Sequence, residues 1–227
     1  RFPLPNLRDP RRHQGMPPLV VRRITDGAVD VWDAYLANRA RFGDTRAYAQ
    51  TLPPPDVVYV NVPQELVSVP AEAFSGSLGK EASSVLALGP LVRNKHRNVL
   101  FVHVRTHMLG DGQASRLLAA AKEDLKIVRG GTLSTSQPAC RTWYASLLLL
   151  RNGFRADEAL STATIPPPNS GIAAQSASIT FTYSAGDFNP EEHLTYVRKL
   201  RDVHRARSTA FSDELDAVAA YLERDRD

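Results

Sequence analysis

Apolar residues gather in two runs near the middle of the chain, Val99 to Val104 and Leu125 to Val128. A turn containing Gly110 and Gly112 follows the first run, and the apolar residues from Gln113 to Leu125 have the spacing of a helix. This pattern predicts a central β-α-β unit, whose strands are buried on both faces and covered by helices from elsewhere in the chain. It indicates the fold class α/β, with α+β as the alternative.

Period-two and period-3.6 patterns predict further strands and helices on both sides of this unit. Proline clusters at 53–55 and 166–168 separate them, because proline cannot continue a helix. Asn189, followed by a proline and two acids, is a strong helix start. The predicted elements are a helix over 30–50, a strand over 57–62, an edge strand over 65–69, an apolar stretch over 85–91, a helix over 138–151 capped by Ser136 and ended by Gly153, a short helix over 156–162, a strand over 176–183, and one long or two shorter helices over 189–226, with the second start at Ser212.

The first 23 residues, Arg1 to Arg23, show no periodic pattern before Leu19 and contain five prolines, six arginines and one acidic residue. A segment of this composition cannot bury enough of itself to offset its conformational entropy. It is expected to be an extended arm, either ordered on a partner or solvated. The sequence thus divides into a basic arm at 1–23, an α/β domain at 24–188 and a C-terminal helical segment at 189–227.

The chain has 227 residues, of which 43% are hydrophobic and 23% charged, and its formal net charge is +4. These values are typical of a globular domain with a sizeable core. No apolar run reaches the roughly 18 residues that span a bilayer, so no transmembrane segment is expected. The single cysteine, Cys140, excludes a disulfide framework and a multi-cysteine zinc site, which favours a reducing compartment.

Arginine outnumbers lysine among the basic residues, and the chain begins at Arg1 instead of methionine. A cleaved organellar presequence would account for both features. The sequence therefore predicts a mitochondrial, matrix-side location. A GC-rich genome would also enrich arginine, and a missing N-terminus would also explain the first residue.

The sharpest local motif is His107-Met-Leu-Gly-Asp111-Gly112, which follows a predicted strand and precedes a predicted helix. It resembles the HxxxDG signature of the chloramphenicol-acetyltransferase and condensation-domain superfamily. The resemblance implies an acyltransferase in which His107 is the general base on an acceptor hydroxyl or amine, Asp111 orients the loop and Gly112 permits the turn. A histidine with a pKa near neutral suits that proton abstraction. The alternative is a surface turn that closes the β-α-β unit.

Gly110 and Gly112 also stand where the main-chain N–H groups of a helix start can bind a phosphate. Against this, Asp111 would repel an anion, and neither GxGxxG nor GxxxxGK[ST] is present. On an extended strand His103 and His107 would be about 13 Å apart, too far to share a metal ion. The sequence predicts no metal site and no cofactor.

Basic residues gather in the arm and just before the apolar run at 99–104. Such side chains contact phosphates or acidic partners without reading a base sequence. The candidate phosphate- or partner-binding residues are Arg8, Arg11, Arg12, Arg22, Arg23, Arg93, Lys95 and Arg97.

The arm, the proline connectors, the terminal helices and the lack of a complete catalytic set favour a non-catalytic accessory or structural subunit of a large organellar assembly. The mitochondrial ribosome and a respiratory or ATP-synthase complex are the expected kinds of assembly. The partners would be other protein subunits and, in a ribosome, ribosomal RNA. An acyltransferase built around His107 is the alternative, and a stand-alone nucleic-acid binder ranks below both.

Overall fold

The computed structural model describes residues 19–37, 52–70, 82–90, 96–104, 112–127, 131–135, 143–163 and 179–225. Helices and strands are mixed along the chain, so the fold class is α/β, as predicted. The chain divides into two compact units. The first unit comprises Arg1–Leu91 and Val99–Ala121, and the second comprises Val92–Asn98 and Lys122–Asp227.

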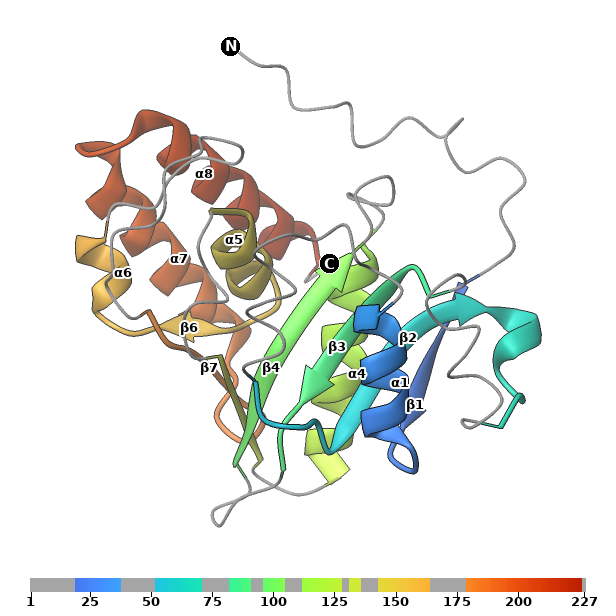
Figure 1. Cartoon of the computed structure of the whole chain (residues 1–227). Coiled ribbons are helices and arrows are strands. Elements are labelled where there is room, and N and C mark those ends of the chain that lie inside the picture. The colour runs from blue at the N-terminus through green and yellow to red at the C-terminus, as the bar shows by residue number, and fades with distance from the viewer. Residues whose placement is uncertain are drawn as a thin grey trace. The chain divides into compact units, whose positions relative to one another are not determined.

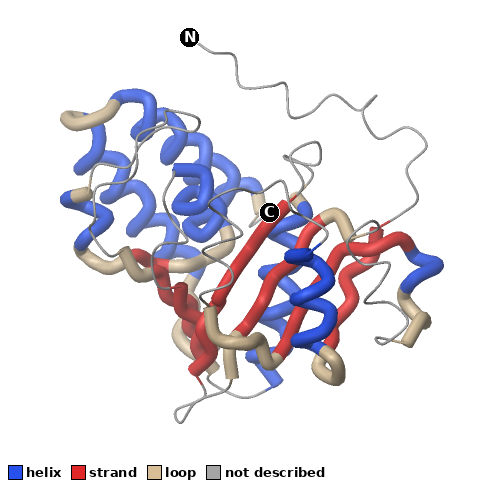
Figure 2. The backbone as a smooth tube through the Cα atoms, in the orientation of Figure 1, coloured by secondary structure: helices blue, strands red, loops and turns tan. Residues whose placement is uncertain are grey.

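The first unit is built on an antiparallel sheet (Figures 1 and 2). Its strands pair in chain order, with a register shift between β3 and β4 at Ala87 and Leu88. That shift is a bulge, because Ala87 pairs with Phe101 while Leu88 pairs with Val99. The strands are β1 (Leu19–Ile24), β2 (Val57–Pro63), β3 (Ser84–Leu88) and β4 (His96–Val104), of which the residues from Val99 onward belong to this unit.

Strand β2 is buried along its whole length, because helices cover both faces of the sheet. Alternate residues of a strand point to opposite faces. Val58 and Val60 join Trp32 and Tyr35 of α1 (Ala28–Ala37) in an apolar cluster on one face. Helix α4 (Gln113–Ile127) lies on the other face (Figure 1). That second face receives Tyr59 and Asn61, together with the buried residues Leu117, Leu118 and Ala121 of α4.

The second unit combines short strands with a helical hairpin. Strand β7 pairs antiparallel with both β5 and β6. Gly153 ends α5 in the left-handed region with φ of 86°, and the Gly153 and Phe154 N–H groups donate to the carbonyls of Leu150 and Leu149, as in a Schellman cap. The elements are β5 (Thr132–Thr135), α5 (Trp143–Arg151), β6 (Arg155–Ala156), α6 (Ala159–Thr162), β7 (Phe181–Ser184), α7 (Pro190–Arg205) and α8 (Thr209–Arg224).

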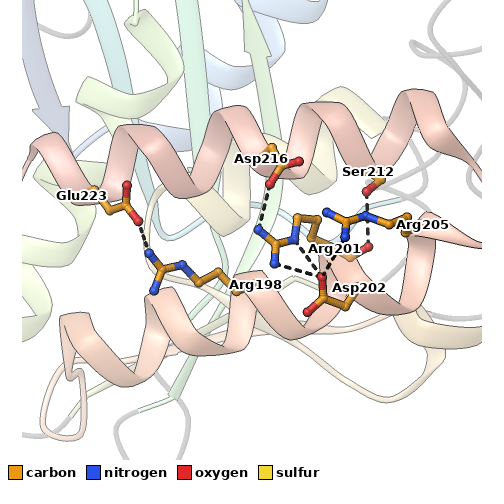
Figure 3. A network of polar contacts seen from close by, with 7 residues as sticks. All are labelled: Arg198, Arg201, Asp202, Arg205, Ser212, Asp216 and Glu223. Carbon is orange, nitrogen blue, oxygen red and sulfur yellow. Dashed lines mark hydrogen bonds and ion pairs between the residues drawn. The ribbon is translucent and has the colours of Figure 1, made fainter.

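Helices α7 and α8 start at side-chain caps and pack along one another. The Asn189 side chain accepts hydrogen bonds from the N–H groups of Glu191 and Glu192, and Ser208 accepts from the N–H group of Phe211. Ion pairs cross the hairpin (Figure 3), among them Arg198 with Glu223 and Arg201 with Asp216, each pair including an exposed carboxylate. Exposed pairs stabilise little, so buried apolar residues of the two helices supply most of the hairpin's stability.

The structure confirms several predicted elements and corrects others. The strand at 57–62, the two C-terminal helices and the Asn189 start are confirmed. The described part of the second apolar run, 125–127, is the end of α4, because Leu125 continues the buried helical stripe of Leu118 and Ala121, and the strand follows later at β5. No edge strand forms at 65–69, where η2 (Gln64–Leu66), a short 3₁₀ turn, follows Pro63.

Two boundaries also differ from those predicted. The last residues of the segment expected to be an arm, Leu19 to Arg23, lie in β1, because they pair with β2. Helix α8 begins at Thr209 instead of Ser212, since the Ser208 side chain provides the cap. The remaining arm and the helix start at Ser136 and Pro138 lie outside the described residues. In the part of the chain that the structure describes, no helix is long and apolar enough to cross a membrane.

Two buried histidines hold α7 against neighbouring main chain in the second unit. The His193 Nε2 lies 2.7 Å from the Leu150 carbonyl oxygen, and the His204 Nε2 lies 2.8 Å from the Leu160 carbonyl oxygen. Each ring must carry its proton on Nε2 to donate to a carbonyl. Burial is the largest cause that lowers the pKa of both histidines, and Arg155, beside His193, lowers the pKa of that ring further.

We expect the free energy of unfolding to fall as the pH drops below about 6.5. The unfolded chain binds protons on these histidines in that range, while the folded chain, with lowered pKa values, does not. Urea denaturation at a series of pH values measures the effect. Replacing both residues, His193→Gln and His204→Gln, keeps a side-chain N–H donor and should flatten the acid limb. An acid limb unchanged in this double variant would contradict the assignment.

Candidate functional site

Helix α4 begins immediately after Gly112, which has a φ of 70°. Residues with a side chain avoid this left-handed region, so the turn favours glycine. The Arg116 N–H donates to the Gly112 carbonyl at 2.9 Å, which closes the first helical turn. No heavy atom of the described residues lies within 4 Å of where a Cβ of Gly112 would stand.

Beneath this helix start lies a group of polar side chains, Asn61, Ser83, Ser84 and Gln113, which we call the buried amide cluster. None of the four is more than 5% exposed. The Asn61 Nδ2 donates to Ser84 Oγ at 2.6 Å and to the Gln113 carbonyl at 3.2 Å. Ser83 Oγ and Ser84 Oγ donate to Gln113 Oε1 at 2.5 and 3.0 Å. The first residue of α4 is therefore bonded through both its main chain and its side chain to β2 and the start of β3.

The two ends of the segment that joins β4 to α4 meet at one residue. Ser84 pairs with Val104, the last residue of β4, and its hydroxyl bonds the side chain of Gln113, the first residue of α4. Residues 105–111, which connect these ends, lie outside the described residues. The structure thus fixes where this connecting segment leaves the sheet and where it enters the helix.

The electrostatics of this helix start suit an anion. The first N–H groups of a helix have no partner within the helix, and its aligned peptide dipoles place partial positive charge at that end. The first turn of α4 contains no acidic side chain that would occupy those groups. A glycine turn after a strand, followed by such a helix start, is an arrangement that binds phosphate.

Of the sequence-predicted acyltransferase residues, the structure describes Gly112 alone, and it places this glycine at the helix start. His107 and Asp111 lie outside the described residues, so their roles stay predictions. Arg8, Arg11, Arg12, Arg93 and Lys95 from the basic set also lie outside the described residues.

The described members of the basic set are Arg22, Arg23 and Arg97. Arg22 and Arg23 are neighbours in β1 and therefore point to opposite faces. The Arg22 guanidinium donates to the Leu66 carbonyl at 3.0 Å, while Arg23 is exposed. Arg97 is half-buried in β4. Phosphate contact by Arg22, Arg23 and Arg97 stays a prediction.

The sequence analysis missed the buried amide cluster. One signal was available, since Asn61 interrupts the otherwise apolar strand Val57–Val62. An amide there must find hydrogen-bond partners if the strand is buried on both faces. The partner residue, Gln113, stands 52 positions later and gives no local sign of this role. Among the described residues, no group of three or more histidine, cysteine or acidic side chains could hold a metal ion.

No protein-family model and no curated protein matches the chain. Among solved structures it resembles a protein assigned as an acyl-CoA N-acyltransferase from Klebsiella pneumoniae, with 15% sequence identity and a TM-score of 0.48, over 74% of this chain and 97% of that one. It also resembles IAA acetyltransferase from Bacillus cereus, with 19% identity and a TM-score of 0.46, over 74% of this chain and 99% of that one.

The similar structures, which include a Desulfovibrio desulfuricans protein assigned to the GNAT family of acetyltransferases, are described as acyl- or acetyltransferases. The protein from Desulfovibrio has 15% identity and a TM-score of 0.45, over 74% of this chain and 99% of that one. This finding contradicts the predicted non-catalytic subunit of an organellar assembly, and with it the predicted partners, other subunits and ribosomal RNA. At these identities the activities of those enzymes do not carry over to this chain.

We expect Gly112→Ala to lower the free energy of unfolding by about 1 kcal/mol, because alanine disfavours the left-handed region while its Cβ meets no neighbour. Gly112→Asn should lose less, since asparagine tolerates this conformation. Urea denaturation compares the two variants. Gly153→Ala is the matched control and should lose more, because its Cβ would lie 2.7 Å from the Phe188 ring. Equal stability of wild type and Gly112→Ala would contradict the assigned backbone conformation.

Proposed function

We propose that the chain is an acyltransferase whose donor is a thioester of coenzyme A. The observation that supports this most directly is the start of α4: a glycine with positive φ, a helix end without acidic residues in its first turn, and no atom of the described residues within 4 Å of the position of a Gly112 Cβ. Such a start favours a phosphate ligand. An acyl thioester of coenzyme A has a pyrophosphate at one end and the activated acyl group at the other, so one donor would account for both the phosphate-binding helix start and the acyl transfer.

The chemistry separates the two ends of this donor. The acceptor amine or hydroxyl attacks the thioester carbonyl, the carbon–sulfur bond breaks, the acceptor loses a proton, and coenzyme A leaves as the thiol. The pantetheine arm holds the thioester away from the pyrophosphate. A residue beside the phosphates therefore cannot also abstract the acceptor's proton.

This separation gives His107 a role different from that of the HxxxDG histidine. His107 stands five residues before Gly112 in the connecting segment. If α4 binds the pyrophosphate, His107 belongs to the donor-binding segment, where its ring can donate a hydrogen bond to a phosphate. The general base then lies elsewhere in the chain.

Binding of the donor's parts tests this function. We expect coenzyme A and adenosine 3′-phosphate 5′-diphosphate to raise the melting temperature of the protein, and pantetheine alone to raise it much less. A ligand at about 100 times its Kd stabilises the folded state by about 2.7 kcal/mol. Thermal unfolding with each compound measures the shifts. No shift with millimolar coenzyme A would contradict the proposal.

The His107→Ala variant separates the two roles of this histidine. A donor-binding role predicts a higher KM for acetyl-CoA with little change in kcat and an unchanged pH profile, whereas a general base predicts a loss of kcat together with the acid limb of the profile. Release of free thiol in the presence of a panel of amines gives both parameters. Lys199→Ala, which removes an exposed charge on α7, is the control for a general loss of positive charge. A fall in kcat alone would contradict our assignment.

A mitochondrial location stays a prediction from the composition, and targeting of a tagged full-length protein would test it. The proposed acyl transfer does not depend on the location, because acyl thioesters of coenzyme A are not confined to one compartment.

A further inference from the structure

The buried amide cluster is not completely satisfied. In the part of the chain that the structure describes, the Asn61 Oδ1 and the Gln113 Nε2 are buried without a hydrogen-bond partner. A buried polar atom without a partner lowers stability, and a partly satisfied polar network is less stable than an apolar core of the same shape. An apolar core of the same shape would therefore be more stable, so stability does not explain why these polar residues lie beneath α4.

The hydrogen bonds of the cluster are directional, although the single Ser83 hydroxyl proton has two acceptors within reach, Gln113 Oε1 at 2.5 Å and the Asn61 carbonyl at 3.3 Å. The Asn61 amide group faces the Gln113 carbonyl and must present its nitrogen there. The Ser84 hydroxyl accepts from that nitrogen, so its own proton is directed to Gln113 Oε1. Apolar contacts would tolerate a small rotation or slide of the helix, because they have no direction. These hydrogen bonds do not tolerate it, because they weaken steeply when their angles change.

We propose that the buried amide cluster is a positioning device for the donor site. It holds the first turn of α4 at a fixed height and rotation on β2 and β3, and so presets the main-chain N–H groups that receive the donor's phosphates. Asn61, Ser83, Ser84 and Gln113 act through the helix and do not touch the donor. This inference rests on the proposed function, since it assigns a task to the helix start that binds the donor.

Main-chain N–H groups that are already held in place bind a ligand more tightly than mobile ones, because their ordering has occurred before the ligand arrives. Loss of the cluster should therefore weaken donor binding while leaving the reacting end of the donor unaffected. A role in stability alone would instead change the melting temperature and leave KM unchanged.

The test replaces the whole cluster with apolar residues of similar size, Asn61→Val, Ser83→Ala, Ser84→Ala and Gln113→Leu, in one quadruple variant. Removing all partners together leaves no stranded polar side chain, so the fold should stay close to wild type in stability. We expect KM for acetyl-CoA to rise about tenfold, the size expected for the loss of one good hydrogen bond to a charged group. The kcat should stay close to the wild-type value.

Two further variants keep the result interpretable. Ser146→Ala removes a buried hydroxyl from α5, in the second unit, and should leave KM unchanged. If the quadruple variant does not fold, Ser84→Ala replaces it, and a smaller rise in KM is expected. An unchanged KM in a folded quadruple variant, or in Ser84→Ala when only that variant folds, overturns the inference.

Hydrogen exchange separates failure of this inference from failure of the proposed function. Absence of donor binding by the wild-type protein would refute the proposed function alone. The N–H groups of residues 116–119, which bond the carbonyls of the first helical turn, beginning with Arg116 to Gly112, would then decide whether the cluster positions the helix start. Faster exchange there in the quadruple variant, with the rest of α4 unchanged, supports positioning, and unchanged exchange overturns it.

Discussion

Ser84 fixes both ends of the segment on which the proposed function depends. Its main chain pairs with the last residue of β4, and its hydroxyl bonds the side chain that opens α4. The two ends of this segment, Val104 and Gly112, are therefore held at the same place on the sheet. The position of the helix start is therefore a property of the sheet beneath it and not of the connecting segment alone.

This arrangement explains why polar residues occupy a place where apolar ones would fill the core better. Both faces of β2 are buried, yet Asn61 stands on one of them. Its Nδ2 donates to the Ser84 hydroxyl of β3 and to the Gln113 carbonyl of α4, while its Oδ1 has no partner among the described residues. Places where a chain departs from the rule of an apolar core are often sites at which position matters more than stability. The helix start above the cluster is a site of that kind.

In the second unit, buried polar side chains likewise fix the position of a helix, α7, through directional hydrogen bonds. There, buried imidazoles bond main-chain carbonyls at the ends of α5 and α6, which ties α7 to two short elements. Aromatic rings of Phe154, Tyr183, Phe188 and Tyr196 surround this junction, and the hydroxyl of Tyr196 both donates to and accepts from the main chain of Ala156. Burial raises the pKa of Tyr196 to about 12, so the phenol stays protonated and keeps both bonds. The exposed ion pairs of the hairpin contribute little to its stability.

Local physical chemistry was enough to predict the α/β class, strand β2, the caps at Asn189 and Gly153 and the turn at Gly112. Each of these features depends on residues a few positions apart, such as a cap and the N–H groups of the next turn. The tertiary structure alone decided that Leu19 to Arg23 pair with β2, that Leu125 ends a helix, and that Asn61 and Gln113 meet. A strand edge, a buried stripe and a buried amide are satisfied by partners far along the chain, and no local pattern identifies those partners.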